Sequence, residues 1–535
     1  MTDDISGDYG PTSAPKDGDR SARPGEAVLE LVDKSLADLF CDQYGRSFAV
    51  VKLKQHQETI SIGSTNFKHW ISKVYYQENK ATLSSEVISA VLNTLKGRAL
   101  FDGPRRYIDV RTASMPGGNV IYYDLTNTTW QAVRITAEGW TVGQAPLLFT
   151  RYNHQLPQVD PAKNAPKDTF DKFLALTNIG SDDHKLLVKV YIVALFVPDI
   201  SKPLLIVDGE QGGAKTFLQR MIKSVVDPSA ADALAIPKQP AELIQQLSHN
   251  YLALYDNLSK LDDWASDIFC KAVTGGGSSK RMLYSDDDDI VYSFRRCVML
   301  NGINVAARKP DLLDRALMIH LERIPKEKRR KESDLLAELE AIKPDLLGRI
   351  MDILVEVQRR KGEVHLTEYP RLADFAEYGE LIARCMGEPD GRFTAAYFEN
   401  QKLQTIEALE AQPVGTAVMR LVELEQEWRP SSLGSLLEKL EEIAEANKIS
   451  TKSKGWPKAP NSLSRRLNEV RTNLREVGIE VKLDTDSGTN TRTVEIRKIS
   501  PVSPEPPEGQ NQAQTGTLFT GDTASKTSGD TSGKS

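Results

Sequence analysis

The sequence has few cysteines, no long apolar run and no apolar leader, and each shortage excludes a class of protein. Its 4 cysteines include no C-x-x-C pair, which argues against a disulfide framework and a zinc site. The longest apolar run, Leu186–Val197, contains Lys189 and is shorter than the roughly 20 residues that span a bilayer. No apolar stretch follows Met1, so we expect a cytoplasmic protein without a secretory signal or a membrane contact.

Aromatic residues are also scarce, at 7%, but the composition is otherwise that of an ordinary soluble protein. Hydrophobic residues make up 40% and charged residues 27% of the chain, which suits globular domains. A chain of 535 residues is too long for one core, because domains usually contain roughly 100 to 200 residues. The net charge of −6 excludes a uniformly basic nucleic-acid coat, so any contact with DNA must use local positive charge.

Changes in composition along the chain predict an α/β protein with several units. Both ends are rich in Asp, Gly, Ser and Pro, a composition typical of disordered tails. No repeat that would indicate a solenoid is present. The predicted units are a disordered tail (1–26), an N-terminal α/β domain (27–155), a helical lead-in (156–200), a core (201–325), a helical domain (326–410), a C-terminal module (411–498) and a second disordered tail (499–535).

The N-terminal α/β domain is predicted to carry no chemistry of its own. It combines a helix over 85–95 with strand-like runs over 107–111, 119–125, 131–135 and 139–142. A primase would need paired carboxylates on adjacent strands to hold metal ions, and no such Asp-x-Asp pair occurs on these strands.

A glycine-rich loop, Gly209–Thr216, follows an apolar strand over 203–208 and opens a helical segment. This order is typical of a phosphate-binding loop, in which backbone N–H groups wrap a phosphate, a lysine reaches the phosphates and a hydroxyl ligates Mg²⁺. Lys215 and Thr216 supply the last two groups. Ala214 replaces the last glycine of the usual pattern, which is least intrusive where that residue has helical dihedrals. The alternative is a glycine-rich turn before an ordinary helix.

Polar residues at the ends of later strands complete the predicted site. Asp256 ends an apolar strand over 250–255 and is predicted to hold Mg²⁺, and Asn301 ends the strand over 297–300 and can orient the attacking water. Arg315 is suited to reach the nucleotide of a neighbouring subunit. The residues predicted to contact ATP are Gly209, Glu210, Gln211, Gly212, Gly213, Ala214, Lys215, Thr216 and Phe217.

These motifs resemble the superfamily 3 helicases, AAA+-related hexameric motors, and among them the poxvirus- and phage-type branch. The resemblance covers roughly 165–325 and includes the segment 271–281. It implies a P-loop NTPase core, with ATP shared between subunits and with contact of Lys280 and Arg281 with DNA or with the adjoining nucleotide. Asn304 is a substitute for Asn301 in this resemblance. The catalytic residues that it implies are Lys215, Asp256, Asn257, Asn301 and Arg315.

Two features depart from that family. Asn257 stands where the family usually has a second acidic residue, and an amide cannot act as a base. The predicted hairpin, with strands over 282–285 and 290–294, has Asp286–Asp289 at its tip. Carboxylates there would repel a phosphate backbone, and the aspartates are better interpreted as a solvated turn than as a metal site.

The C-terminal module is predicted to be a winged helix. Helices over 433–444 and 462–477 precede two alternating strands, 479–483 and 492–496. The second helix has a basic face, and we predict that Asn461, Arg465 and Arg466 contact duplex DNA. The module also resembles the C-terminal DNA-binding part of phage-type replication helicases. A solvated helix face or a protein-docking winged helix is the alternative.

The sequence therefore predicts an ATP- and Mg²⁺-dependent DNA helicase or translocase for replication of a phage, plasmid or integrated element. We expect single-stranded DNA inside a homo-oligomeric ring, duplex DNA at the winged helix, and a separate primase. An NTPase that acts on DNA as a loader or switch without unwinding is the main alternative. A third is a DNA-binding adaptor that retains nucleotide only for structure.

Overall fold

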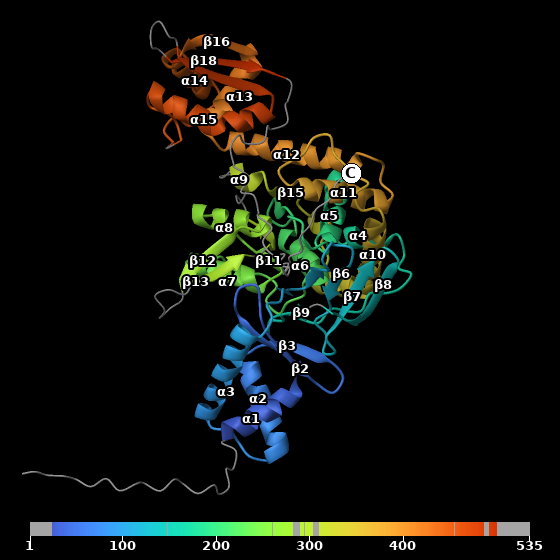
Figure 1. The fold of residues 1–535 in the computed structure, drawn as a ribbon. Helices are drawn as coiled ribbons and strands as arrows, with labels where there is room; N and C mark the ends of the chain where they lie inside the picture. The colour runs from blue at the N-terminus through green and yellow to red at the C-terminus, as the bar shows by residue number, and fades with distance from the viewer. Residues whose placement is uncertain are drawn as a thin grey trace, which may run out of the picture.

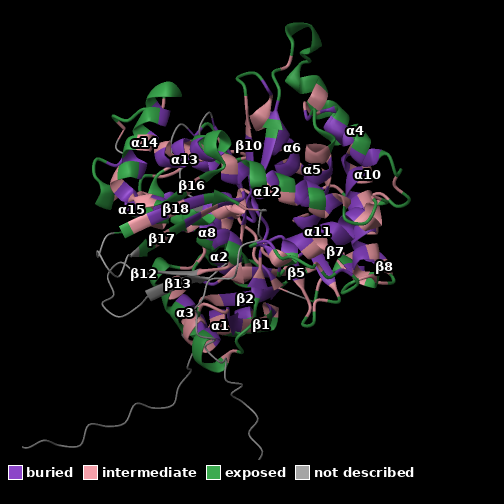
Figure 2. Cartoon of the chain, turned by 90° about the horizontal axis from the view of Figure 1, so that it is seen from above, coloured by how far each residue is buried: buried purple, intermediate pink, exposed green. Residues whose placement is uncertain are grey.

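The computed structural model of the chain describes residues 24–146, 148–258, 261–281, 289–293, 295–302, 310–453, 455–485 and 492–499. Figure 1 shows a mixed α/β chain in which the first helices and strands lie at one end, the last ones at the other, and the largest body between them. Buried residues are concentrated inside these bodies (Figure 2). Among the described residues, no helix has both the length and the apolar character needed to cross a membrane.

The N-terminal body has its own hydrophobic core. Val32, Phe67, Ile71 and Leu95 are fully buried in one cluster, beside an antiparallel sheet with the order β1-β2-β3. Its first helix begins at Pro24, inside the predicted tail. The elements are α1 (Pro24–Ser35), β1 (Leu36–Cys41), β2 (Ser47–Lys52), β3 (Gln57–Ser61), α2 (Thr65–Asn79), α3 (Ser85–Gly97) and the π-helix η1 (Arg98–Asp102).

Most of the strands that follow pack against the central body, whereas Ile108 of β4 and Leu148 of β9 pack against Phe40 and Phe48 of the N-terminal sheet. Val133, Ile135 and Trp140 share a cluster with helices of the central body, and Trp140 Nε1 donates to Asp352 Oδ1 at 2.8 Å. The hydrophobic residues of 27–155 are thus divided between separate cores. The strands are β4 (Ile108–Asp109), β5 (Thr112–Ser114), β6 (Ile121–Asp124), β7 (Gln131–Thr136), β8 (Gly139–Gln144) and β9 (Leu148–Phe149).

The central body contains a parallel four-stranded sheet with the order β11-β14-β10-β15. Side chains of β10 alternate, since Leu205 and Val207 belong to one cluster and Leu204 and Ile206 to the cluster on the opposite face. The strands predicted over 203–208, 250–255 and 297–300 are present, and β14, the third of them along the chain, lies between β10 and β11. The strands are β10 (Leu204–Gly209), β11 (Leu252–Tyr255), β14 (Cys297–Asn301) and β15 (Ala316–Leu321).

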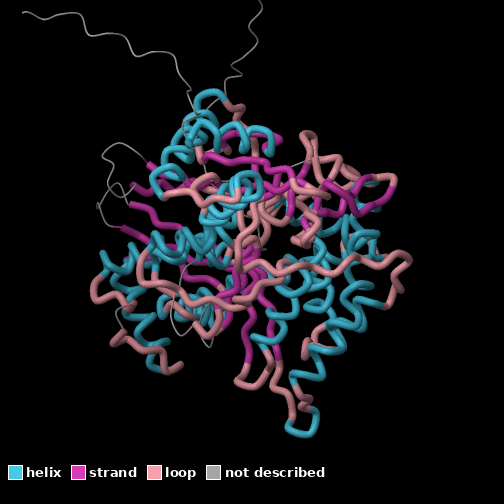
Figure 3. The backbone as a smooth tube through the Cα atoms, turned by 90° about the horizontal axis from the view of Figure 1, so that it is seen from below, coloured by secondary structure: helices cyan, strands magenta, loops and turns pink. Residues whose placement is uncertain are grey.

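Helices flank the strands of the central body (Figure 3). The predicted helical lead-in is present but interrupted, because Ser181 accepts from the His184 N–H and starts a new helix. The helices are α4 (Thr169–Ala175), α5 (Asp182–Ala194), α6 (Lys215–Val226), α7 (Pro240–His249), α8 (Asp263–Thr274), α9 (Pro310–Leu313), the 3-10 helix η2 (Lys326–Lys328), α10 (Glu332–Arg359), α11 (Ala373–Met386) and α12 (Arg392–Glu410).

A hairpin connects α8 to β14, with an earlier first strand than the sequence suggests. β12 (Gly277–Arg281) pairs antiparallel with β13 (Asp289–Ser293), so that Lys280 lies opposite Ile290 and Arg281 opposite Asp289. The predicted first strand, 282–285, and Asp286–Asp288 of the tip lie outside the described residues.

The C-terminal body contains the predicted helices and strands together with a helix and a strand that the sequence analysis missed. Its sheet has the order β16-β18-β17, and Leu436, Leu467 and Ile496 lie in one fully buried cluster. Gly478 has a φ of 84° and follows the end of the last helix, where glycine is the residue that adopts this conformation without strain. The elements are α13 (Pro413–Glu425), β16 (Glu427–Ser432), α14 (Leu433–Ala446), α15 (Pro460–Glu476), β17 (Ile479–Thr485) and β18 (Arg492–Lys498).

Candidate nucleotide-binding site

The carboxyl ends of three parallel strands meet beside the glycine-rich loop. β10 ends at Gly209, Asp256 directly follows β11, and Asn301 ends β14. Ligands of open parallel sheets bind at this edge, where crossover connections leave room between strands. Because β14 lies between β10 and β11, Asn301 is placed between the loop and Asp256.

The loop folds tightly against the end of β15. The Gly213 N–H donates to the Glu210 carbonyl at 3.2 Å, and Gly209 has a φ of 127°. A Cβ on Gly209 would lie 2.0 Å from the Leu321 carbonyl oxygen, so only glycine fits there. No side chain caps the amino end of α6, which leaves N–H groups of its first turn available to an anion.

Ala214 does not have the helical dihedrals on which its tolerance was predicted. Its φ is 62° and its ψ is 32°, in the left-handed region. That conformation brings Cβ close to the following carbonyl in any residue other than glycine. The glycine of the usual pattern would relieve this strain, so the condition under which alanine is the least intrusive substitute is not met.

Lys215 lies folded over the loop that it follows. Its Nζ donates to the carbonyl oxygens of Gly209 at 2.7 Å and Glu210 at 3.0 Å. These carbonyls hold the ammonium above the loop, within reach of a group bound by the loop. Phe217, predicted to contact the nucleotide, is buried in the core of the central body.

Thr216 and Asp256 are in direct contact across the carboxyl edge of the sheet. The Thr216 hydroxyl donates to Asp256 Oδ1 at 3.0 Å. A hydroxyl and one carboxylate fit Mg²⁺, which prefers oxygen ligands and usually takes only one or two carboxylates besides water and phosphate. The described residues contain no cluster of three or more His, Cys, Asp or Glu side chains suited to a metal.

Asn301 is buried, with an exposure of 2%, and contacts the same threonine. Its Nδ2 lies 3.4 Å from Thr216 Oγ1 and 2.6 Å from Gln219 Oε1. Its Oδ1 accepts from the Asn257 N–H at 3.0 Å. Asn304, which the sequence offered as a substitute, lies outside the described residues.

Gln219 belongs to this network and was not predicted. It lies one turn after Thr216, is fully buried, and donates from Nε2 to the Leu300 carbonyl at 2.9 Å. Buried polar groups need hydrogen-bond partners, so Gln219 fixes the position of the Asn301 amide. The available signal was a glutamine among the apolar residues on the inner face of α6.

Two further polar residues lie at this edge. Asn257 has an exposed side chain and a left-handed φ of 57°. Asp208 ends the apolar part of β10, its Oδ2 lies 3.3 Å from His320 Nδ1, and its Oδ1 is buried without a hydrogen-bond partner among the described residues. Asp208 is therefore a second carboxylate beside the loop.

Arg315 lies far from the loop of its own chain. It precedes β15 and its carbonyl accepts from the Leu204 N–H at 2.8 Å, at the amino end of β10. The loop follows the carboxyl end of β10, several residues of about 3.3 Å each away. Arg315 Nη1 donates to the Asp311 carbonyl at 2.6 Å and pairs with the Asp311 carboxylate. Burial alone would raise the pKa of Asp311, but the hydrogen bond and positive charge of Arg315 outweigh it and lower that pKa.

The residues predicted to bind DNA lie on separate elements. Lys280 and Arg281 are on β12, beside the core, and the structure does not describe their side chains. Asn461 is exposed in the first turn of α15, and the Arg465 side chain is 70% exposed. Arg466 pairs with Glu469 at 2.6 Å. These two sets of residues thus form two distant candidate contacts.

Two regions of the chain match family models of replication proteins. Residues 170–388 match the model of the actinomycete integrative conjugative element replication protein, and residues 414–513 match the AICE RepA C-terminal domain. The chain is similar to mobile-element replication proteins. These matches confirm the predicted role in the replication of a mobile element. No curated protein matches the sequence.

Solved structures with a listed likeness include two apo structures of the NrS-1 C-terminal region and one of JCV helicase with a bound small molecule. The first NrS-1 structure is 11% identical to this chain, and the match covers 90% of this chain and 100% of that one, with a TM-score of 0.40. The second is 12% identical, and the match covers 87% of this chain and 98% of that one, also with a TM-score of 0.40. The JCV helicase is 14% identical, with 42% of this chain and 67% of its own covered and a TM-score of 0.24.

Proposed function

We propose that the chain is an ATP-dependent DNA helicase or translocase that serves the replication of an integrative conjugative element. The contact between the Thr216 hydroxyl and Asp256 at 3.0 Å, beside a loop that holds Lys215, carries this proposal. In it, residues 201–325 form a P-loop NTPase core of the AAA+-like, superfamily 3 type. The family matches supply the setting of mobile-element replication.

In this proposal the loop holds the phosphates of ATP. Lys215 exchanges its two loop carbonyls for phosphate oxygens, and the N–H groups at the start of α6 donate to the same anion. Thr216 and Asp256 would hold Mg²⁺, which supplies positive charge that offsets the phosphates. Asn301, fixed by Gln219, orients the attacking water once its long contact with Thr216 is replaced.

The complete site needs a second chain. An arginine at the amino end of β15 cannot reach the loop at the carboxyl end of β10, so Arg315 serves a nucleotide bound by a neighbour. Rings arise from such head-to-tail interfaces, and we propose a hexamer. Breaking the ion pair of Arg315 with Asp311 would accompany that assembly.

DNA contacts complete the proposed motor. Lys280 and Arg281 on β12 would contact single-stranded DNA inside the ring, and the winged helix formed by 411–498 would bind duplex DNA through Asn461 and Arg465. The exposed first turn of α15 suits a major groove. A primase would act as a separate protein.

A second candidate is an NTPase that loads or switches other proteins on DNA without unwinding it. Asn257 favours it, because its exposed amide stands where the resembled family has a carboxylate, and an amide at that position cannot act as the base that speeds hydrolysis. A switch tolerates slow hydrolysis, whereas a motor does not.

The test is ATP hydrolysis by the full chain with and without single-stranded DNA, together with displacement of a strand from a forked duplex. We expect DNA to stimulate hydrolysis and Lys215→Ala to reduce it about 10²-fold or more, because a preorganised positive charge is lost. Lys238→Ala, at an exposed lysine, is the control. Stimulated hydrolysis without strand displacement would favour the loader, and an unchanged rate in Lys215→Ala would exclude this loop from the reaction.

A further inference from the structure

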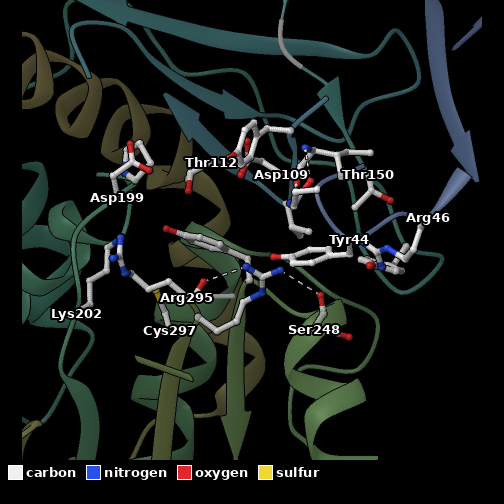
Figure 4. A pocket seen from close by; sticks show the side chains of 18 residues that line it. Tyr44, Arg46, Asp109, Thr112, Thr150, Asp199, Lys202, Ser248, Arg295 and Cys297 are labelled. Atoms are coloured by element: carbon white, nitrogen blue, oxygen red, sulfur yellow. Dashed lines mark hydrogen bonds between the residues drawn. The ribbon is translucent and has the colours of Figure 1, made fainter. Parts of the chain in front are cut away.

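A cavity lies at the opposite edge of the central sheet from the candidate nucleotide site. It has a volume of about 420 Å³ and lies near the amino ends of β11 and β14, since Tyr251 and Cys297 line it. The N-terminal strands close its other side. Figure 4 shows the side chains that face one another across it: Lys202, Arg295, Cys297 and Ser248 on one side, and Asp109, Thr112 and Thr150 on the other.

Lys202 is a buried cation in the wall of this cavity. Its exposure is 3%, and it has no hydrogen-bond or ion-pair partner among the described residues. Burial lowers the pKa of Lys202 to about 8, and the charge of Arg295 acts in the same direction against the weaker effects of Cys297 and Asp199. A buried ammonium without a partner is costly.

Arg295 is a second cation beside it. Its Nε is buried and has no hydrogen-bond partner in the part of the chain that the structure describes. Two positive groups near each other repel, and among the described residues neither the Lys202 ammonium nor Arg295 Nε has a hydrogen-bond partner. An anion between them would remove both penalties.

The other charged groups of the cavity leave this imbalance in place. Arg46 pairs with Asp42 at 2.6 Å, and Arg296 donates to the carbonyls of Leu247 and Ser248 at 3.1 and 3.2 Å. Burial raises the pKa of Asp109 to about 6, so its carboxylate is still mostly ionised near neutral pH and loses its charge only in more acidic solution.

The carboxylate of Asp199 also lines the cavity, and it keeps its negative charge while it accepts from the Ser114 hydroxyl. The cavity lining nevertheless has four cationic side chains, Arg46, Lys202, Arg295 and Arg296, against the two carboxylates of Asp109 and Asp199. Its net charge is therefore positive, and Lys202 and Arg295 are hydrogen-bond donors.

Aromatic rings at the rim narrow the class of anion. Tyr44, Tyr107, Tyr152 and Tyr251 line the cavity, and Tyr107 is 81% exposed. An exposed ring such as Tyr107 beside a positively charged groove is suited to stack on a nucleic-acid base while the groove holds the phosphate. Arg295 also follows β13 closely in the chain, so a strand that contacts the hairpin would pass this cavity.

We propose that this cavity binds a nucleotide phosphate, with Lys202 and Arg295 holding its oxygens and Tyr107 stacking on the base. The source could be a DNA strand or a free nucleotide, and the chemistry is the same. If the phosphate belongs to a DNA strand, the cavity adds a DNA contact at the base of the hairpin to the proposed motor. This form of the proposal rests on the proposed function.

The test uses the full chain and a fluorescent thymidine oligonucleotide, with binding followed by anisotropy at several salt concentrations. Lys202→Met with Arg295→Gln should weaken binding roughly tenfold or more and lower the salt slope by about one to two. The matched control, Lys167→Met with Arg134→Gln, removes the same charge from exposed positions and should match wild type. Equal affinity and slope in the two double variants would overturn the proposal.

Competition by thymidine monophosphate and by inorganic phosphate identifies the source. Competition by the monophosphate at low concentration would assign the cavity to a free nucleotide, and binding of the oligonucleotide alone would assign it to DNA. Both results support a nucleotide phosphate, whereas equal competition by inorganic phosphate and the monophosphate contradicts base stacking.

Thermal melting separates binding from folding. Lys202→Met alone should melt no lower than wild type, because an apolar side chain replaces an uncompensated charge, and it should still bind the oligonucleotide more weakly. A lower melting temperature would mean that the ammonium has a structural partner and would overturn the proposal. If wild type hydrolyses no ATP but its oligonucleotide binding depends on Lys202 and Arg295, the motor fails and the cavity stands.

Discussion

At the scale of single residues, the loop keeps a strained alanine where its pattern calls for glycine. Ala214 has a φ of 62°, and the Leu218 N–H donates to its carbonyl at 3.1 Å, which places it at the turn into α6. A left-handed conformation costs about 1 to 2 kcal/mol for residues other than glycine. The surrounding contacts of the loop and α6 hold the residue there despite that cost.

We therefore expect Ala214→Gly to raise the free energy of unfolding by up to about 1 kcal/mol, since relief of strain exceeds the entropy that glycine adds to the unfolded chain. Chemical denaturation measures it. Ala395→Gly, at an exposed position inside α12, should instead lower the free energy of unfolding by about 1 kcal/mol. A loss of stability in Ala214→Gly would show that the alanine is not strained.

At the scale of elements, a buried ion network joins the β5–β8 sheet to the end of α6. Arg111 is fully buried and its Nε donates to Asp227 Oδ1 at 2.9 Å. Lys223 lies 3.5 Å from the other oxygen of Asp227 and donates to the Leu252 carbonyl. Burial alone would raise the pKa of Asp227, but Lys223 and Arg111 outweigh it and lower the pKa to about 2.

Removal of one partner should be costly. Arg111→Met should lower the free energy of unfolding by about 3 to 5 kcal/mol, because Asp227 loses a buried partner, whereas Arg98→Met, at an exposed pair with Asp33, should cost less than about 1 kcal/mol.

Since the pKa of Asp227 is depressed in the folded chain, the stability that its carboxylate contributes is present above about pH 4 and is lost toward about pH 2. Denaturation at both pH values measures this, and a pH-independent difference from Asp227→Asn would contradict it.

At the scale of the whole molecule, the proposed site is divided between two chains. Lys215 begins α6 at the carboxyl edge of the central sheet, after the loop that follows β10, and Arg315 precedes β15 at the amino edge. β10 and β15 are neighbouring strands. A single chain cannot bring them together without unfolding the sheet. Assembly is therefore part of the catalytic mechanism that we propose.

Mixing inactive variants tests this arrangement. Lys215→Ala and Arg315→Ala should each lack ATP hydrolysis, and an equal mixture should recover about a quarter of the wild-type rate, because about a quarter of random interfaces would carry both intact residues. Lys215→Ala alone, at the same total protein concentration, is the control. Full activity of Arg315→Ala alone, or no recovery on mixing, would remove the arginine from the shared site.

Much of the fold was predictable because its signals are local. The strand before Gly209, the helix after it and the polar residues that end β11 and β14 follow from apolar runs and adjacent turn residues. The helix α13 and the strand β16 were missed. Exposed and buried residues do not alternate along β16, Glu427–Ser432. The roles of the site residues and the boundaries of the units remain predictions.

The sequence by itself determined the loop, the order of strands along the chain and the basic helix α15, because each depends on the conformational preferences of neighbouring residues. Only the tertiary structure decided that β14 lies between β10 and β11, that Gln219 holds Asn301, and that Lys202 and Arg295 line one cavity. These contacts join residues far apart in the chain, and they form only when burial of both faces of the sheet selects one order of strands.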